Sequence, residues 1–212
     1  MKKLIIVLLC CLCFQINLIA QASDNNADRD GLNALLTPNE YYIVGSAINV
    51  RSKPNLNSQT LGQLKLHEKV EIVEGVRAIQ KIDNIWADWY KIKYKTGYGY
   101  IWGGYIAHKA LVVDMDKNGV MDYFYCRLRD VQYYISIIDV QQDIIIYINN
   151  KKISTEKLYP QKSTGCEFEI VGDKVHITVR DSSSDENKLE YNLFEVNKNG
   201  EIKFIKKVVE NY

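Results

Sequence analysis

The chain has 212 residues, of which 47% are hydrophobic and 25% are charged, and its formal net charge at pH 7 is +1. A near-neutral chain without a dense basic patch argues against a nucleic-acid-binding protein. Fifteen tyrosines and a rich supply of isoleucine and valine favour β-strands, and the length is enough for one large or two small domains, so we expect an all-β fold.

The N-terminus has the pattern of a secretory signal peptide. Lys2 and Lys3 precede an apolar run at residues 4–12, and Ala20-Gln21-Ala22 is a small-residue cleavage site. Cleavage after Ala22 would leave 190 residues, with 25 basic and 26 acidic side chains because two of the 27 basic residues are removed. We therefore expect an exported protein, periplasmic or secreted at the cell envelope, without a membrane span.

A lipoprotein anchor is the alternative for this segment, because it contains Cys10, Cys11 and Cys13. Lipidation requires small residues before the cysteine, whereas these three follow bulky residues or another cysteine, so cleavage is the preferred interpretation. Residues 23–40 are rich in asparagine and aspartate and are expected to be a flexible lead segment.

Short strand motifs with regular spacing fill residues 41–107. The stretch contains Ala47-Ile48-Asn49-Val50-Arg51-Ser52-Lys53-Pro54 near its start and Gly99-Tyr100-Ile101-Trp102-Gly103-Gly104-Tyr105-Ile106 at its end. Ile48 and Val50 alternate with Asn49 and Arg51, as in a strand with one buried face, and Pro54 then ends that strand. Short strands and turns of this kind suit a small barrel.

These residues, with Leu61-Gly62-Gln63-Leu64 and Trp89-Tyr90-Lys91-Ile92 between them, resemble the bacterial SH3-like domain, a small barrel of envelope and secreted proteins. The family pattern Ala-Leu-Asn-Val-Arg-Ser-Gly-Pro, Gly-x-Leu, Trp-x-Lys-Val and Gly-Trp-Val-x-x-x-Tyr-Leu is matched in order over about a third of the chain. The resemblance implies a module that binds peptidoglycan or a peptide, without catalysis.

Three features depart from the family pattern. Lys53 replaces a glycine, Tyr100 replaces a tryptophan with Trp102 two residues on, and the segment 74–88 is longer than usual between its strands. The longer segment could reshape a ligand groove, so the ligand itself does not follow from the resemblance.

Aromatic side chains near the closing strands are the candidate ligand-binding residues, because Trp and Tyr combine apolar area with a polar tip. Trp89 and Trp102 are the first candidates, since alternation predicts that Ile101 is buried and Trp102 more exposed. The other candidates are Tyr100, Tyr105, Asn49 and Arg51. Burial in the barrel core is the alternative for the aromatic residues, and ordinary loop or surface contacts are the alternative for Asn49 and Arg51.

The remaining residues, 110–212, again have mostly strand patterns. Segments 123–128, 132–140 and 144–148 are rich in β-branched and aromatic residues, and pairs of strands flank Gly172-Asp173 and Asn199-Gly200. We expect the SH3-like barrel at 41–109 to be followed by an antiparallel β-sheet or small β-sandwich domain at 110–212.

The segment from Asp114 to Asp122 has the spacing of a calcium loop. Asp114, Asp116 and Asn118 alternate, Gly119 permits a tight turn, the Val120 carbonyl and Asp122 could complete the ligands, and Ca²⁺ prefers six to eight oxygen ligands. The bidentate Glu of an EF-hand is absent, and a structural Ca²⁺ site between strands is the predicted form. A plain hairpin turn at Asn118-Gly119 is the alternative.

Cys126 and Cys166 would remain after cleavage, and they are either a disulfide or two buried thiols. Cys126 and His176 have the order of a cysteine peptidase, but Cys126 lies in a strand pattern rather than at the start of a helix, where a thiolate is stabilised. We therefore expect no enzymatic activity.

The sequence thus predicts an exported, monomeric, non-catalytic protein of the envelope that recognises peptidoglycan or an envelope peptide or protein. One alternative is a structural protein in which the SH3-like barrel only packs against the second domain. The other is a cell-wall hydrolase, which requires an exposed Cys126 beside His176.

Overall fold

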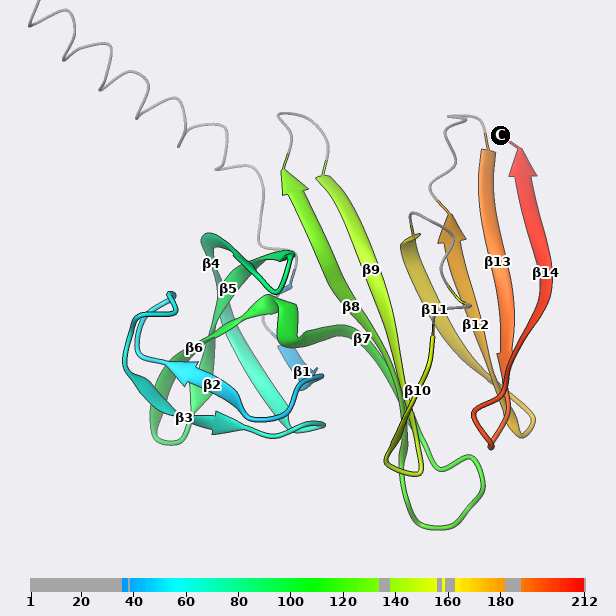
Figure 1. Cartoon of the computed structure of the whole chain (residues 1–212), viewed down its shortest axis with the longest axis horizontal. Coiled ribbons are helices and arrows are strands. Elements are labelled where there is room, and N and C mark those ends of the chain that lie inside the picture. Colours follow the sequence, from blue (N-terminus) through cyan, green and yellow to red (C-terminus); the bar gives the residue numbers. More distant parts are fainter. Residues whose placement is uncertain are drawn as a thin grey trace, which may run out of the picture. The chain divides into compact units, whose positions relative to one another are not determined.

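The computed structural model describes residues 36–37, 39–133, 138–155, 158, 163–181 and 188–211, and it is all-β as the sequence predicts (Figure 1). The predicted signal peptide, with its three cysteines, and residues 23–35 of the predicted lead segment lie outside the described residues. The last part of that lead segment is structured, because Leu36 is buried in a hydrophobic core and the first strand begins at Asn39.

The strands are β1 (Asn39–Ile43), β2 (Ile48–Arg51), β3 (Thr60–Leu64), β4 (Lys69–Ile82), β5 (Ile85–Tyr94), β6 (Gly97–Trp102), β7 (Ile106–Val113), β8 (Asp122–Tyr133), β9 (Ile138–Ile148), β10 (Lys151–Ile153), β11 (Ser163–Val171), β12 (Lys174–Asp181), β13 (Lys188–Val196) and β14 (Ile202–Asn211), and one 3-10 helix, η1, spans Gly103–Tyr105.

Ten strands form sheet A in the order β10-β9-β8-β7-β1-β4-β5-β6-β2-β3. Strand β1 lies between β4 and β7, pairing with β4 over Asn39–Tyr42 and with β7 at Tyr42 and Ile43. The SH3-like stretch therefore shares one hydrogen-bonded sheet with the strands that follow it. The expected boundary after Lys109 falls inside β7, which continues to Val113.

The SH3-like part of sheet A surrounds a core of aliphatic side chains. Alternate residues of each strand point into this core, as in any half-buried strand. The buried members are Leu36, Ile43, Ile48, Val50, Leu64, Val70, Ile72, Tyr90, Ile92, Ile101, Ile106 and Leu128. Ile101 is fully buried, as alternation predicts.

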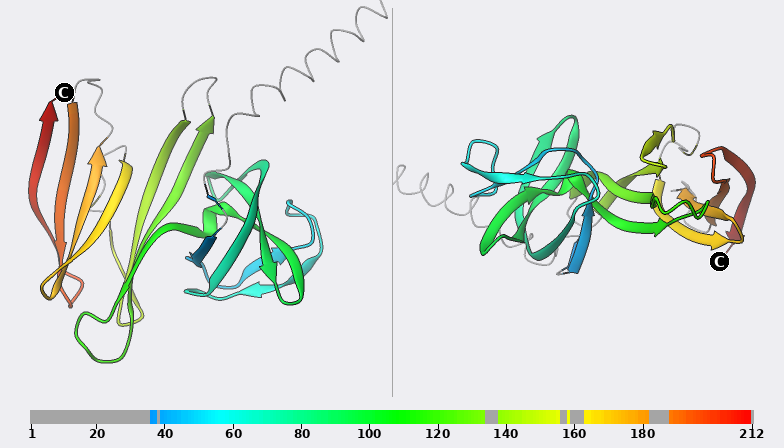
Figure 2. Two further views of the ribbon diagram at one scale, coloured as in Figure 1. Left: turned by 180° about the vertical axis from the view of Figure 1, so that it is seen from behind. Right: turned by 90° about the horizontal axis from the view of Figure 1, so that it is seen from below.

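The second sheet, sheet B, has the order β11-β12-β13-β14 (Figure 2). Val175, Ile177 and Val179 of β12 point to one face and are fully buried. They pack in one cluster with Phe124 of β8 and Ile144 of β9, so sheet B covers a face of the second half of sheet A. This arrangement agrees with the small β-sandwich expected after the SH3-like part.

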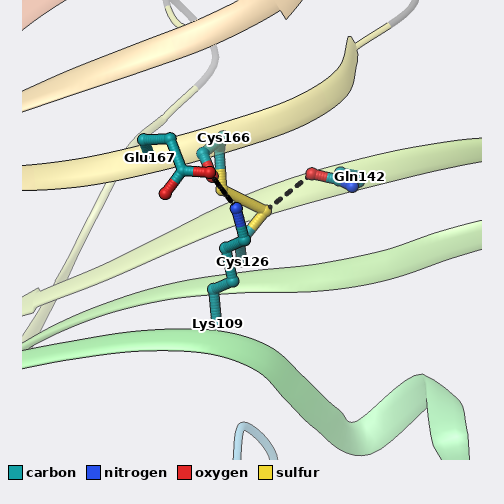
Figure 3. Close-up of a disulfide and its surroundings, with 5 residues drawn as sticks. All are labelled: Lys109, Cys126, Gln142, Cys166 and Glu167. Carbon is teal, nitrogen blue, oxygen red and sulfur yellow. Dashed lines mark hydrogen bonds and ion pairs between the residues drawn. A yellow bond between two sulfur atoms is a disulfide. The ribbon is translucent and has the colours of Figure 1, made fainter. Parts of the chain in front are cut away.

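A disulfide between Cys126 of β8 and Cys166 of β11 joins the two sheets, with 6.7 Å between the Cα atoms (Figure 3). Lys109 of β7 adds two polar contacts at the same place, since its Nζ donates to the Cys166 carbonyl at 3.0 Å and pairs with Glu167. Of the two cysteine alternatives from the sequence, the structure has the disulfide.

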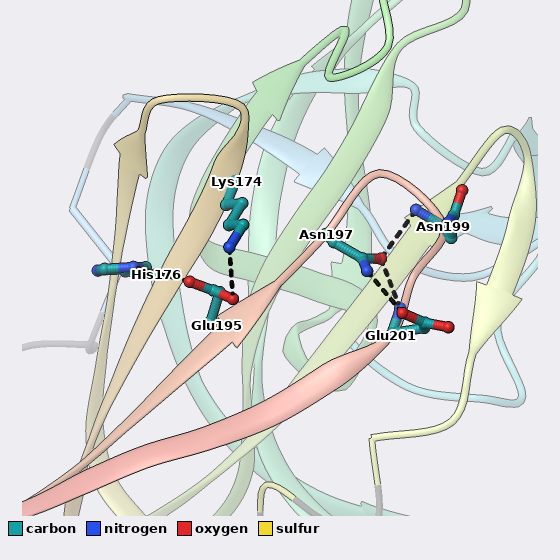
Figure 4. A network of polar contacts seen from close by, with 6 residues as sticks. All are labelled: Lys174, His176, Glu195, Asn197, Asn199 and Glu201. Carbon is teal, nitrogen blue, oxygen red and sulfur yellow. Dashed lines mark hydrogen bonds and ion pairs between the residues drawn. The ribbon is translucent and has the colours of Figure 1, made fainter.

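The turns of the second half lie where the sequence predicts them. Asn149 and Asn150 between β9 and β10 have positive φ, as do Gly172 before β12 and Gly200 before β14. At the last turn the Asn197 side-chain oxygen accepts hydrogen bonds from the backbone N–H groups of Asn199, at 3.0 Å, and Glu201, at 3.1 Å (Figure 4). Gly200 follows Asn199 with a φ of 78°, a region that L side chains rarely adopt.

An aromatic cluster connects the loop between β3 and β4 to β8 and β9. The His67 ring stacks on Tyr123 with 3.8 Å between centroids and meets Tyr147 edge-on at 4.8 Å. Its Nδ1 lies 2.8 Å from the Tyr125 hydroxyl. Burial lowers the pKa of His67 and thereby favours the neutral ring, whose Nδ1 shares a hydrogen bond with this hydroxyl. No sequence pattern predicts this cluster, because His67 is far from the three tyrosines along the chain.

Candidate functional site

The candidate binding residues lie on β2, β5 and β6, whose side chains alternate between two faces of sheet A. Trp89 pairs with Trp102, Lys91 with Tyr100 and Lys93 with Tyr98 across β5 and β6. These six side chains share the face that points away from the SH3-like core, because the residues between them, such as Tyr90 and Ile101, are in the core.

Trp89 and Trp102 are covered, although they belong to that outward face. Each is 2% exposed, so the expectation that Trp102 is more exposed is wrong. The reason is the long β4–β5 hairpin, whose residues pack on both rings. The Trp89 indole N–H donates to the Gln80 side chain at 3.0 Å, and the Trp102 indole N–H donates to the backbone carbonyls of Gln80, at 3.0 Å, and Ala87, at 3.1 Å.

Gly104 completes the cover from the other side. A Cβ atom at this position would lie 2.1 Å from the Trp102 ring, so only glycine allows the backbone of η1 to approach so closely. Tyr105 contacts the same ring edge-on at 5.1 Å, and its hydroxyl donates to Asp83 at the tip of the hairpin at 3.4 Å. Burial and the nearby Asp83 carboxylate raise the pKa of Tyr105. Tyr105 therefore supports the hairpin and is only partly exposed.

The part of this face beyond the hairpin remains open. Arg51 of β2 pairs with Tyr100 of β6, and Tyr100 pairs with Lys91 of β5, so the three form one row across the strands. Asn49 lies two residues from Arg51, and Tyr98 lies two residues from Tyr100, each on the same face. We call Asn49, Arg51, Tyr98, Tyr100 and Lys91 the outer face.

The polar members of the outer face are positioned by neighbouring residues. Arg51 donates from Nη1 to the Ser58 carbonyl at 2.9 Å, and the Asn49 side-chain oxygen accepts from Gln63 at 3.1 Å. These are the ordinary contacts that the sequence offered as the alternative for both residues. They leave the two side chains partly exposed and restrict their rotamers, which reduces the entropy lost when a ligand binds.

Lysines and glutamates border the outer face. Lys91 pairs with Glu74 at 3.0 Å and Lys93 with Glu71 at 2.5 Å, and these carboxylates raise the pKa of both lysines. Lys91 also lies 5.0 Å from the centre of the Tyr98 ring. The border is therefore balanced in charge, and the aromatic rings are its main apolar surface.

Tyr98 was not among the residues selected from the sequence, yet it is the most exposed aromatic side chain of this region, at 56%. Its parity with Trp89 and Trp102 could have identified it, because all three lie on the same side of the β5–β6 pair. The sequence motifs drew attention to the two tryptophans instead, and these serve the core of the hairpin.

The predicted calcium loop forms the turn between β7 and β8. Its carboxylates accept hydrogen bonds from the loop itself: Asp114 from the N–H groups of Asn118 and Gly119, and Asp116 from that of Asn118. The Asn118 side chain accepts from the Val120 N–H at 2.7 Å. Among the described residues, which include this whole loop, no three acidic, histidine or cysteine side chains are grouped to hold a metal ion.

Asp122, the last predicted ligand, is buried with 1% exposed. Its two oxygens accept from the backbone N–H groups of Met115, at 3.0 Å, and Asn149, at 2.9 Å. The loop atoms are thus arranged as a hydrogen-bonded turn and do not fit a bound metal as they stand, and calcium binding stays a prediction.

The residues required for the hydrolase alternative do not meet. Cys126 is fully buried in the disulfide, so it has no thiol to ionise (Figure 3). His176 lies on β12 beside Glu195 of β13, with 3.7 Å between Nε2 and the carboxylate, and Lys174 also pairs with Glu195 at 2.9 Å (Figure 4). The alternative therefore lacks its proposed nucleophile.

Comparison with known proteins gives two matches. Residues 46–107 match the bacterial SH3 domain family. Bacteriocin BCN5 of Clostridium perfringens is 41% identical over 67 residues, which cover 32% of this chain and 6% of that protein. This chain therefore aligns with a small part of the relative, and the similarity concerns one module. No solved structure matches the chain at a significant level.

The motifs, the strands and the family match agree on the same stretch of chain. Within the described residues, no helix is long and apolar enough to cross a membrane. Domains of the matched family are typical of cell-wall binding modules. Residues 46–107 are thus a bacterial SH3 domain, set within a larger all-β chain.

Proposed function

We propose that the protein is a non-catalytic binding protein of the cell envelope, and that its SH3 domain recognises peptidoglycan or an envelope peptide through the outer face. The observation that carries this proposal is the placement of Asn49, Arg51 and Tyr100 on one open face with the exposed Tyr98. Three of the six residues selected from the sequence thus come together, while Trp89 and Trp102 are buried elsewhere.

The chemistry of the outer face suits recognition without reaction. Aromatic rings offer flat apolar area to a sugar ring or a peptide side chain, and Arg51 and Asn49 supply polar groups that orient a ligand. The described part of this face has no histidine, cysteine or carboxylate pair placed for proton transfer or nucleophilic attack. Export to the envelope is part of the proposal, supported by the signal-peptide pattern and the disulfide.

The similarity to a bacteriocin supports the proposal only for the module. The aligned region covers about a third of this chain, a length similar to that of the SH3 domain. The activity of the bacteriocin as a whole is not carried over.

Retention of the purified protein on protein-free peptidoglycan tests the proposal. The double variant Tyr98→Ala, Tyr100→Ala should bind roughly thirtyfold more weakly, because aromatic residues at the centre of an interface each contribute about 1 kcal/mol or more. The matched control is Trp86→Ala, which removes a 39% exposed aromatic residue from the opposite side of β5.

Equal retention of all three proteins would show that binding occurs elsewhere on the molecule. No retention of the unmodified protein would favour the structural alternative, in which the SH3 domain serves to support the rest of sheet A. That alternative has its own support, since β1 joins the SH3 domain to β7 and the hairpin covers Trp89 and Trp102.

A further inference from the structure

Strand β14 forms one edge of sheet B. It pairs with β13 over its whole length, from Val196–Ile202 to Lys188–Asn211, and no other described strand pairs with its second side. Figures 1 and 2 show β14, in red, at the end of the sheet with its outer side free. An edge strand of ten residues presents a row of backbone groups to any strand that can pair with it.

The side chains of β14 are unusually apolar for an open edge. Phe204 is 52% exposed and Val209 is 46% exposed. Phe204 pairs with Phe194 and Val209 with Glu190, and both point to the face that carries the buried residues of sheet B. This pair of apolar side chains near the two ends of the strand would gain burial from a neighbouring strand.

The charged side chains of β14 are distributed unevenly along it. Lys203 and Lys206 lie in the first part and Glu210 near the end, all on the face opposite to Phe204 and Val209. Lys207, on the other face, already pairs with Glu190 at 2.6 Å. A strand that is basic at one end and acidic at the other complements itself when two copies pair antiparallel.

We propose that β14 pairs antiparallel with β14 of a second copy of this chain, with Lys203 opposite Glu210 of the partner. The same register places Phe204 opposite Val209, because 203 and 210 share one face and 204 and 209 share the other. Both pairs occur twice by the two-fold symmetry of such a dimer. The result is an eight-stranded sheet made from the four-stranded sheet B of each copy.

The other edge of sheet B is a less suitable partner for β14. On β11 the Cys166 carbonyl accepts a hydrogen bond from Lys109, and Glu167 pairs with the same lysine. That edge therefore has one of its two acidic side chains, Glu167, and one of its carbonyls already bound within the chain. A closed two-fold pair of β14 edges also avoids the open-ended growth that head-to-tail pairing would produce.

Lys207 weakens the proposed dimer. Because the β13–β14 pairing skips Ile205, this register sets Lys206 opposite Val208 of the partner and Lys207 opposite its own symmetry mate at the two-fold axis, where like charges repel. Lysines on edge strands commonly limit association in this way. We therefore infer a reversible dimer that dissociates when the protein is diluted and weakens as ionic strength rises, because salt screens its two Lys203–Glu210 pairs.

The test is the mass of the full chain in solution, measured by sedimentation over a range of concentrations. The unmodified protein should change from one copy to two as its concentration rises. Lys203→Glu and Glu210→Lys should each weaken dimerisation roughly tenfold, because each change places like charges opposite one another twice. The double variant Lys203→Glu, Glu210→Lys should restore it. Lys198→Glu, in the exposed turn before β14, is the control for net charge.

A single-copy mass at every concentration would overturn the proposal and leave the monomer expected from the sequence. Single variants that weaken dimerisation without rescue by the double variant would also overturn it, because the register would then be different. These outcomes do not depend on peptidoglycan binding by the outer face.

Discussion

His108 is a buried histidine in β7, at the place where the SH3 domain meets the strands that follow. Burial, with the nearby Lys109, lowers its pKa to about 4 from the usual 6.5, although the Cys126 carbonyl and Glu167 act in the opposite direction. Its Nδ1 is buried and has no hydrogen-bond partner among the described residues. A proton added there would place a charge in an apolar setting without an acceptor.

This histidine predicts a loss of stability in acid. Because its folded pKa lies below its unfolded pKa, the unfolded chain binds more protons between pH 6.5 and pH 4, and the free energy of unfolding falls as the pH falls through that range. The loss should reach about 2 kcal/mol at pH 5 relative to pH 7. Urea unfolding at the two pH values measures it.

The variant His108→Gln should lose less stability over the same pH interval, by about the same 2 kcal/mol. His67 acts in the same direction, since its pKa is also lowered, and remains in the variant as a smaller contribution. If the variant and the unmodified protein responded equally to acid, His108 would not carry the effect.

Asp122 and Asp116 separate the two interpretations of the loop between β7 and β8. Asp122→Ala should destabilise the fold by about 3 kcal/mol, because it leaves two buried N–H groups without acceptors. Asp116→Ala should have a small effect in the absence of metal, because its contacts are exposed.

The sequence further predicts that millimolar calcium raises the melting temperature and that Asp116→Ala removes the rise. An unchanged melting curve in calcium would leave the hydrogen-bonded turn alone.

Two neighbouring residues, Ile101 and Trp102, show what an alternating sequence pattern can and cannot predict. Alternation correctly assigns Ile101 to the core and Trp102 to the opposite face. It cannot predict that Trp102 is buried. The residues that cover its ring, Gln80 and Ala87, belong to the β4–β5 hairpin and reach the ring only through tertiary packing. Burial depends on what lies above a strand, and that information is not in the strand itself.

Among the elements, the β4–β5 hairpin is the main addition to the SH3 domain. The sequence shows that this segment is longer than usual, but it does not show on which side chains the hairpin packs. Its strands continue to a tight turn at Asp83 and Asn84, both with positive φ, and the bulges within the β4–β5 pairing bend it over Trp89 and Trp102. A long hairpin that packs on the domain's own aromatics moves the open surface along β5 and β6 to Tyr98 and Tyr100.

Strand patterns were most informative where one face of the strand is buried and the turns carry distinctive residues. Two strands were expected on either side of the Asn199-Gly200 turn, and the structure has Lys188–Val196 and Ile202–Asn211 there. The pairing of β1 with β7 had no such signal, because it joins residues far apart in the sequence through only two register positions.

At the scale of the molecule, the SH3 domain depends on the strands that follow it. Val44 and Ala107 are buried against Tyr125 of β8 and Ile145 of β9, and Leu128 of β8 is part of the SH3 core. A chain that ends at Lys109 would expose this surface. We expect it to be less stable than the full chain by at least about 2 kcal/mol, the contribution of burying one or two aliphatic side chains.

Urea unfolding followed by tryptophan fluorescence measures this difference, because all three tryptophans lie within the retained part. The variant His67→Ala in the full chain is the matched comparison, since it removes contacts to Tyr123 and Tyr147 without removing any strand. Equal midpoints for the shortened and full chains would show that the SH3 domain is energetically independent.

The position of β1 between β4 and β7 also has a consequence for the order of folding. Tyr42 pairs with Lys69 on one side and with Ala107, 65 residues further along the chain, on the other. A contact between residues so far apart in the sequence requires a large loop to close, which costs conformational entropy before the contact itself contributes any stability. Proteins rich in such contacts therefore fold slowly. A chain that is synthesised from its N-terminus must therefore leave the second side of β1 unpaired until β7 has been made. During that interval the incomplete sheet is open to aggregation and proteolysis.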